Sequence, residues 1–324
     1  MATGPFVSIV IPTRGRPDLL ERAIESCLVS APSGGAEVIV VVNGGDKPPR
    51  ELGELGGLKV IELAVANANA ARNVGLAAAR GEYVRFLDDD DYPLPDGAAS
   101  QYRLAMETQP DVCSGAILLA GANRQSRTIV PAGQDFVAAV LAPSQTTQPT
   151  AHLFRRGFLD GLAWDPQRKH YQDVYWMHGM ARRSDPRWAT VHSVVGVWQH
   201  HSRARISTGF LKQHPEQALM EMESILDETI AILSRDSRLT PARRRAAAEG
   251  LWHCAHHGFP AKPLQWSHTA RKALRLDPRA RPTPFHYAMP WRYLHPLLIE
   301  WALLPKRRLN ILLARSRGLR AGEP

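Results

Sequence analysis

The stretch VRFLDDDDYP places four consecutive carboxylates, Asp88 to Asp91, directly after an apolar run that is typical of a β-strand. Four adjacent like charges repel one another, so a counter-charge must offset them. Carboxylate oxygens at a strand end suit Mg²⁺ or Mn²⁺, which usually keep several waters and bind substrate phosphates. The alternative is a solvated acidic turn. The strand before the run, and the aromatic residue and prolines after it, favour a metal site.

Two other groups of residues could do chemistry. Asp173 precedes VYWMHGMA, and its spacing alone favours a carboxylate at a helix N-terminus, stabilised by the helix dipole. His253 and His257 in WHCAHHG share a helix face at the spacing of some zinc ligands. No glutamate and no third ligand accompany these histidines, so packing histidines are the favoured interpretation.

Alternating strands and helices must position the acidic run. The pattern predicts a β-α-β-β-α-β-α-β order, which indicates a mostly parallel α/β sheet covered by helices. Ligands of such sheets bind beyond the carboxyl ends of the strands. The groups at 13–16, 43–46 and 88–91 should therefore meet at one edge. The predicted strands are 6–12, 37–43, 57–64, 82–91 and 111–121, and the predicted helices are 17–28, 68–81 and 95–110.

The rest of the chain is less regular. Residues 134–207 show many aromatics and turns, whereas 215–235 and 240–257 have helical spacing. Residues 262–290 are rich in Pro and Arg and fit a linker or a short helical packing element.

The net charge of +9 is concentrated at the C-terminal end. Residues 241–324 carry 16 Lys/Arg and 4 Asp/Glu, giving 16 − 4 = +12, and the first 240 residues carry 24 and 27, giving −3. The basic C-terminal third of the chain indicates an anionic partner. The alternative is that these charges only keep the protein soluble. Nucleic-acid binding is one alternative function, although no known binding motif is present and the body is slightly acidic.

Three widely spaced cysteines form no disulfide framework and no zinc motif, which favours a reducing cytoplasm. No signal peptide and no membrane-spanning stretch is expected. The segment 291–320 mixes Trp and Leu with Lys and Arg, the composition of a helix lying on the anionic inner face of a membrane. Packing on the body, or pairing with a second subunit as a homodimer, are the alternatives.

Several motifs in order resemble glycosyltransferase family 2, the inverting sugar-nucleotide enzymes of GT-A fold. The resemblance covers residues 6–205 and is carried by VSIVIPTRGRPDLLERAIESCL, EVIVVVNGGD, ANAARNVGLAAARGEYVRFLDDDDYPLPDG and HYQDVYWMHGMA. It implies a GT-A, Rossmann-like, mostly parallel α/β domain at 1–210, with a nucleotide-binding half at about 1–121 and an acceptor half at about 122–210. A helical basic region would follow at 211–324.

The resemblance also implies roles for individual residues. Asp90 would be the principal metal ligand, helped by His200 or His201. Asp173 would be the general base, although the family commonly has Glu-Asp where this chain has Gln172 and Asp173. Arg203 and Arg205 could clamp phosphates. The implied nucleotide-sugar site consists of Pro12, Thr13, Arg16, Asn43, Arg72, Asn73, Asp88, Asp89 and Asp91, with Asn43 replacing the aspartate that usually holds the base.

The resemblance therefore implies a Mn²⁺- or Mg²⁺-dependent glycosyltransferase that uses a nucleotide-diphosphate sugar, by family frequency a UDP-sugar. The acceptor would be a saccharide or lipid-linked saccharide in bacterial polysaccharide or glycolipid assembly. A nucleotidyltransferase is the rival enzyme, but the loop after the first strand offers only Gly15 and no Lys. An oxidoreductase is disfavoured, because that loop has no G-x-G-x-x-G.

Overall fold

The computed structural model describes residues 4–47, 58–121, 124–143, 148–200, 210, 213–282 and 293–316. The chain divides into two compact units. The first comprises Met1–Val140 and Gln145–Ile206, and the second comprises Leu141–Ser144 and Ser207–Pro324. His201, Arg203 and Arg205 lie outside the described residues.

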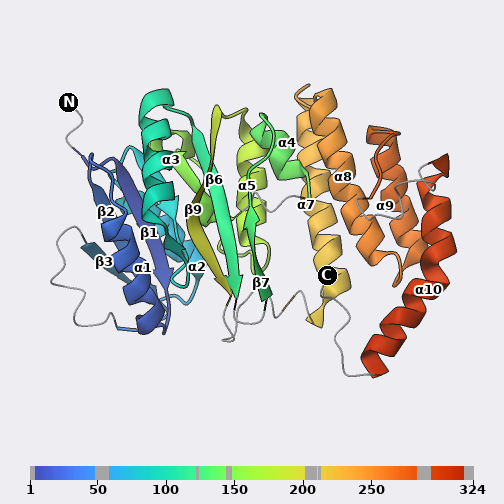
Figure 1. Cartoon of the computed structure of the whole chain (residues 1–324), viewed down its shortest axis with the longest axis horizontal. Helices are drawn as coiled ribbons and strands as arrows, with labels where there is room; N and C mark the ends of the chain where they lie inside the picture. Colours follow the sequence, from blue (N-terminus) through green and yellow to red (C-terminus); the bar gives the residue numbers. More distant parts are fainter. Residues whose placement is uncertain are drawn as a thin grey trace. The chain divides into compact units, whose positions relative to one another are not determined.

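A mixed sheet forms the centre of the first unit (Figure 1). Its strand order is β3-β2-β1-β4-β8-β6-β9-β5, with β7 paired to β6. The first four strands of this order run parallel, and β6 and β9 also pair in parallel, whereas β5, β7 and β8 are antiparallel to their neighbours. The strands are β1 (Val7–Thr13), β2 (Ala36–Asn43), β3 (Leu58–Leu63), β4 (Tyr83–Phe86), β5 (Tyr92–Pro93), β6 (Val112–Gly121), β7 (Arg124–Ile129), β8 (His152–Arg155) and β9 (Trp188–His200).

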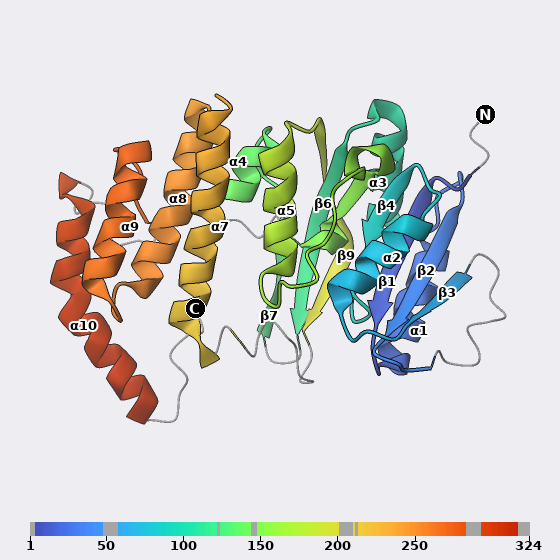
Figure 2. The same ribbon diagram turned by 180° about the vertical axis from the view of Figure 1, so that it is seen from behind.

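Helices cover both faces of this sheet. Figure 1 shows α1 and α3 in front of it, and Figure 2 shows α2 and α5 on the opposite face. The predicted helices and strands of residues 6–121 are confirmed to within a few residues, except that the fourth strand ends before the acidic run. The irregular segment 134–207 contains the long strand β9, which its pattern did not predict. The helix expected after Asp173 is present as α5. The helices are α1 (Pro17–Val29), α2 (Ala68–Ala78), α3 (Pro95–Thr108), α4 (Phe136–Leu141) and α5 (Gln172–Arg183).

The continuous apolar runs of the sequence explain the buried strands. All seven residues of β1 are buried, as a parallel strand covered on both faces requires. Small residues let the helices come close: a Cβ added at Gly75 of α2 would lie 2.3 Å from the Val10 side chain of β1. At the start of the strands, buried Glu37 accepts hydrogen bonds from Ser8 Oγ at 2.6 Å and from Arg80 N at 2.6 Å, which ties β1, β2 and the end of α2 together.

The described part of the second unit is helical. The helix predicted at 215–235 is confirmed, and the one predicted at 240–257 is displaced by one residue. Thr240 caps the second of them by accepting from Arg243 N. Residues predicted as a linker or short helical element include a full helix, α9. Within the described residues, no helix is long and apolar enough to cross a membrane. The helices are α7 (Pro215–Arg235), α8 (Pro241–Gly258), α9 (Pro263–Leu276) and α10 (Pro296–Ser316).

The close approach of α3 to β9 gives a stability prediction. A Cβ added at Gly97 would lie 1.9 Å from the Val194 carbonyl oxygen, a backbone atom that cannot turn away. We expect Gly97→Ala to lower the free energy of unfolding by about 1–3 kcal/mol, as overpacking does. Chemical denaturation of both proteins measures this difference.

Gly179 in α5 provides the matched control. An added Cβ there would meet Leu162 at an ordinary 3.5 Å, so Gly179→Ala should stabilise the protein by up to about 1 kcal/mol through helix propensity. Equal effects of the two substitutions would contradict the close approach of α3 and β9.

Candidate active site

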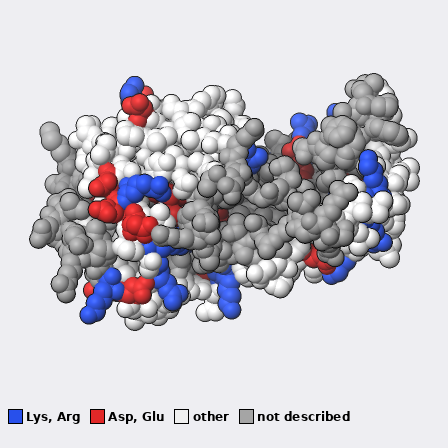
Figure 3. All heavy atoms as spheres, turned by 60° about the horizontal axis from the view of Figure 1, so that its bottom comes forward, with Lys and Arg blue, Asp and Glu red and all other residues white. Residues whose placement is uncertain are grey.

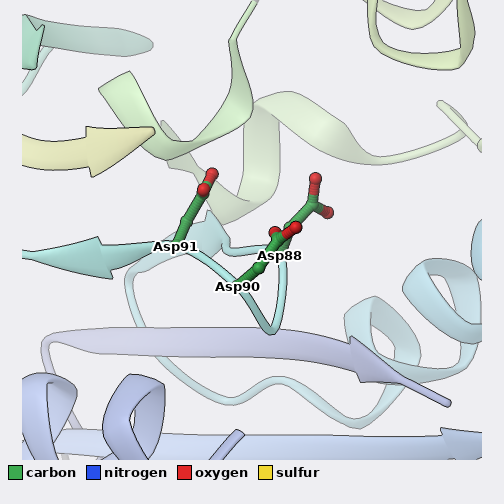
Figure 4. Close-up of side chains that lie close together, drawn as sticks. All are labelled: Asp88, Asp90 and Asp91. Atoms are coloured by element: carbon green, nitrogen blue, oxygen red, sulfur yellow. The ribbon is translucent and has the colours of Figure 1, made fainter. Parts of the chain in front are cut away.

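The four aspartates form a turn between β4 and β5, which we call the acidic turn (Asp88–Asp91). Leu87 N donates to the Val10 carbonyl, which continues the pairing of β4 with β1, and Asp91 N donates to the Asp88 carbonyl at 3.0 Å, which closes the turn. One carboxylate oxygen from each of Asp88, Asp90 and Asp91 lies within 4.8 Å of the other two. Figure 4 shows the three side chains rising from this turn. Within the described residues, this is the only such group of three His, Cys, Asp or Glu side chains.

Basic and hydroxyl side chains from the end of β1 and from α1 hold the middle of the acidic turn. Thr13 Oγ1 donates to Asp89 Oδ2 at 2.7 Å, and Arg16 NH1 lies 3.2 Å from Asp90 Oδ2 and 3.3 Å from Asp89 Oδ1. Arg22 donates to the Asp90 carbonyl at 2.9 Å. The sequence-predicted residues Thr13, Arg16, Asp89 and Asp90 are therefore in direct contact.

Asp91 is held by residues from a different part of the chain, Thr150 and Gln199. Its two carboxylate oxygens accept hydrogen bonds from Thr150 Oγ1 at 2.8 Å and from Gln199 N at 3.0 Å. Burial, followed by the negative charges of Asp90 and Asp88, raises the pKa of Asp91 well above its usual value. The buried side chain of Asp91 thus fixes the acidic turn to Thr150 and to β9.

Burial also raises the pKa of Asp89, to about 6, although Arg16 and the Thr13 hydroxyl act in the opposite direction. Negative charge is therefore held in the acidic turn at an electrostatic cost, because the buried acids would bind protons more readily than free aspartate. A cation placed among these oxygens would favour the ionised state.

Arg72 joins the acidic turn to α5. The side chain projects from α2 and is almost fully buried. One terminal nitrogen donates to Asp88 Oδ1 at 2.7 Å, and the other donates to Asn69 Oδ1 at 3.0 Å and to Gln172 Oε1 at 3.2 Å. The guanidinium carbon lies 4.6 Å from the ring centroid of Trp164. Arg72 therefore bridges the first aspartate of the turn and the first residue of α5.

Asp173 follows directly in the first turn of α5 and is partly buried. Tyr171, just before the helix, has the left-handed φ of 49°, which sets the direction in which α5 begins. Burial raises the pKa of Asp173 to about 6; the backbone N–H of Val174 lowers it, the charge of Asp88 raises it and Arg72 lowers it. The carboxylate thus lies within the electrostatic field of the acidic turn.

The remaining predicted site residues have different surroundings. Asn43, at the end of β2, donates to the Thr13 carbonyl at 2.8 Å, and Pro12 is buried in β1 beside it. Asn73 donates to the Trp164 carbonyl and accepts from Trp164 N, both at 2.8 Å, so its amide connects α2 to the segment before α5. His200 ends β9, and its side chain, like all of His201, is outside the described structure.

Three residues of the site were not singled out from the sequence. Thr150 holds Asp91 and Trp164 receives Arg72, and both lie in the segment that looked irregular. Gln172 was noted only as a lost carboxylate, whereas it accepts a hydrogen bond from Arg72. Its place directly before Asp173 was the one sequence signal available. Figure 3, which brings the lower side of Figure 1 forward, shows acidic and basic side chains close together on the first unit.

The bridge formed by Arg72 gives a second prediction. Arg72→Met removes charged hydrogen bonds to Asp88 and Gln172, so we expect the free energy of unfolding to fall by about 1.5–3 kcal/mol. Amides at the start of α5 should also exchange faster with deuterium. Arg103→Met, at an exposed position of α3, is the matched control and should change neither quantity. Unchanged exchange in the Arg72 variant would contradict the bridge.

The chain is similar to known glycosyltransferases in sequence and in fold. The model of the family Glycosyl transferase family 2 matches residues 8–160. The "Uncharacterized glycosyltransferase EpsJ" of Bacillus subtilis is 32% identical over 155 residues, which are 44% of this chain and 42% of that protein. "Glycosyltransferase GlyA" of Streptococcus pneumoniae is 27% identical over 114 residues, 34% of this chain and 16% of that protein. The chain thus spans less than half the length of these curated relatives.

Solved structures show the fold. TarS residues 1–349 of S. aureus, in complex with UDP-GlcNAc, matches 97% of this chain and 92% of that chain, with a TM-score of 0.62 and 18% identity. The same protein in complex with UDP matches with a TM-score of 0.60 and 17% identity, over 96% and 91% of the two chains. The predicted GT-A fold is confirmed. The family model of glycosyl transferase family 2 thus matches the part of the chain that contains β2, α2 and the acidic turn.

Proposed function

We propose that the chain transfers a sugar, with inversion at the anomeric carbon, from a nucleoside-diphosphate sugar to a hydroxyl of a saccharide or lipid-linked saccharide. The observation that carries this proposal is the connection, through Arg72, between the acidic turn and the start of α5 with Asp173. One group of carboxylates can balance a departing diphosphate, and a separate carboxylate can accept a proton.

A divalent cation, Mn²⁺ or Mg²⁺, fits the acidic turn. The donor set consists of carboxylate oxygens, which both ions prefer, and the oxygens of three aspartates are close enough to share one ion. Asp90 and Asp88 would hold it. Asp91 is anchored by Thr150 and Gln199 and would add negative charge from behind. When bound, such an ion acts as a Lewis acid that stabilises negative charge on the diphosphate.

Residues at the ends of β1 and β2 would receive the nucleotide. Thr13 and Asn43 are hydrogen-bonded to each other through the Thr13 carbonyl, and Thr13 also holds Asp89. Together with Pro12 and Arg16 they would line the base and ribose pocket. A UDP-sugar is the proposed donor, supported by the UDP-GlcNAc and UDP complexes of TarS, whose fold this chain shares.

In the chemical step, the protein acts mainly by placing the donor, the acceptor and the base. As the acceptor oxygen attacks the anomeric carbon, its proton passes to a carboxylate oxygen of Asp173. The bond from that carbon to the diphosphate oxygen breaks, and its electron pair leaves with the diphosphate. A single displacement inverts the configuration. Arg72 keeps the base-bearing helix in register with Asp88 during this step.

We place this reaction in the cytoplasm, as part of polysaccharide or glycolipid assembly. Three buried, unpaired cysteines support a reducing compartment. The similarity to the glycosyltransferases EpsJ and GlyA supports a bacterial setting.

The role of Asp173 gives a third prediction. Because the base acts only when it is ionised and its pKa is raised to about 6, kcat/KM should fall as the pH drops through about 6 rather than through the ordinary value for aspartate near 4. Asp173→Asn should reduce kcat by at least about 100-fold without loss of folding. A pH–rate profile of both proteins measures these effects.

Asp96→Asn is the matched control, because Asp96 occupies the same place in the first turn of α3 and is exposed. Its turnover and pH profile should equal those of the unchanged protein. Full turnover by a folded Asp173→Asn variant would remove Asp173 from the role of base.

A panel of UDP-, GDP- and dTDP-sugars tests the donor, since slow hydrolysis needs no acceptor. We expect one UDP-sugar to release UDP in the presence of Mn²⁺, and both a chelator and Asp90→Asn to stop the release. Asp96→Asn should leave it unchanged. Release of pyrophosphate instead of a nucleoside diphosphate would indicate nucleotidyl transfer and overturn the proposal.

A further inference from the structure

One side of α10 exposes large apolar side chains to solvent. Leu298 is 63% exposed, Leu309 is 55% exposed and Leu312 is 61% exposed. Residues at such spacing share a side of a helix. We call this side the outer face of α10; it consists of Leu298, Trp301, Leu309, Leu312 and Leu313.

The opposite side of α10 is fixed inside the second unit. Glu300 is fully buried and lies 2.5 Å from His256 Nδ1 on α8 and 2.6 Å from Arg307 NH1. Arg307 also donates to the His256 carbonyl at 2.6 Å. Turning α10 to hide its outer face would expose Glu300 and break these bonds, so the apolar side chains stay on the surface.

Basic side chains flank the outer face. At 100° per residue, exposed Lys306 falls on one edge of the apolar arc and exposed Arg308 on the other. Arg308 Nε donates to the Pro260 carbonyl at 2.8 Å, which holds that side chain at the edge. Glu300 is the only acidic residue in the sequence of α10, and it faces inward. The surface is thus apolar in the middle and positive at both edges.

We propose that the outer face of α10 binds an anionic lipid bilayer, with the helix lying flat in the headgroup region. The two edges with Lys306 and Arg308 would meet lipid phosphates while the leucines enter the acyl boundary. Trp301, which packs against Phe259 at 5.4 Å between ring centroids and remains 41% exposed, is suited to that depth.

Charge favours a bilayer over a second copy of the chain. A symmetric pair would bring the same positive edges together, and the outer face has no acidic residue to complement them. The surrounding segment 241–324 has a charge of +12, from 16 Lys/Arg and 4 Asp/Glu, which adds to the attraction toward an anionic surface. This proposal does not depend on the reaction proposed for the first unit.

Vesicle flotation with the full chain tests the proposal. We expect binding to vesicles in which a third of the phosphatidylcholine is replaced by phosphatidylglycerol, and much weaker binding to phosphatidylcholine alone. Leu309→Ser with Leu312→Ser should reduce the partition coefficient at least about tenfold, because two side chains no longer enter the bilayer. Lys306→Gln with Arg308→Gln should reduce it roughly fivefold for each charge removed.

Substitutions on α9 provide matched controls. Leu264→Ser removes a leucine that is 79% exposed and should leave flotation unchanged. Arg271→Gln with Arg275→Gln removes two exposed charges away from the outer face and should reduce flotation less than Lys306→Gln with Arg308→Gln does. Equal flotation of the outer-face variants and the unchanged protein would overturn the proposal. So would the absence of binding together with a concentration-dependent dimer that Leu309→Ser dissociates in sedimentation equilibrium, because the occupant would then be a second copy.

Discussion

Mutual repulsion among the aspartates after β4 is the constraint around which the first unit is arranged. Different parts of the chain hold these carboxylates. Arg72 from α2 holds Asp88, and Thr150 with the backbone of β9 holds Asp91. Thr13 of β1 holds Asp89, and Arg16 holds both Asp89 and Asp90. Elements that are far apart in sequence therefore converge on one turn. The sheet supplies the rigid edge, and hydrogen bonds to the ionised groups offset part of the cost of placing them there.

Arg72 extends this arrangement to the second carboxylate position. A guanidinium can donate in several directions at once, so a single side chain fixes Asp88 and the first residue of α5 together. Because Gln172 is neutral, the positive charge of Arg72 is balanced by Asp88 rather than shared with a second carboxylate. The chain thus has one negative charge fewer beside Asp173 than the Glu-Asp pair of the resemblance would bring.

The sequence predicted those parts of the fold in which local pattern and burial agree. The apolar runs of β1 and β2 and the helical spacing of α1 and α2 are strong local signals, and the order of the motifs led to the resemblance and to the acidic turn. The strand β9 was missed, because its stability comes from pairing with β6 rather than from a regular period. Contacts such as that of Thr150 with Asp91 join residues 59 positions apart, which no local pattern reveals.

The buried pairing of Glu300 with His256 and Arg307 has a consequence for how this chain can vary. A charged group buried between two helices fixes their rotation and their position along the axis, because a shift of either helix would leave the charge without a partner. The residues of the outer face of α10 then do not need to specify the fold. Substitutions on that side could therefore change which surface α10 binds, while the helix keeps its position in the second unit.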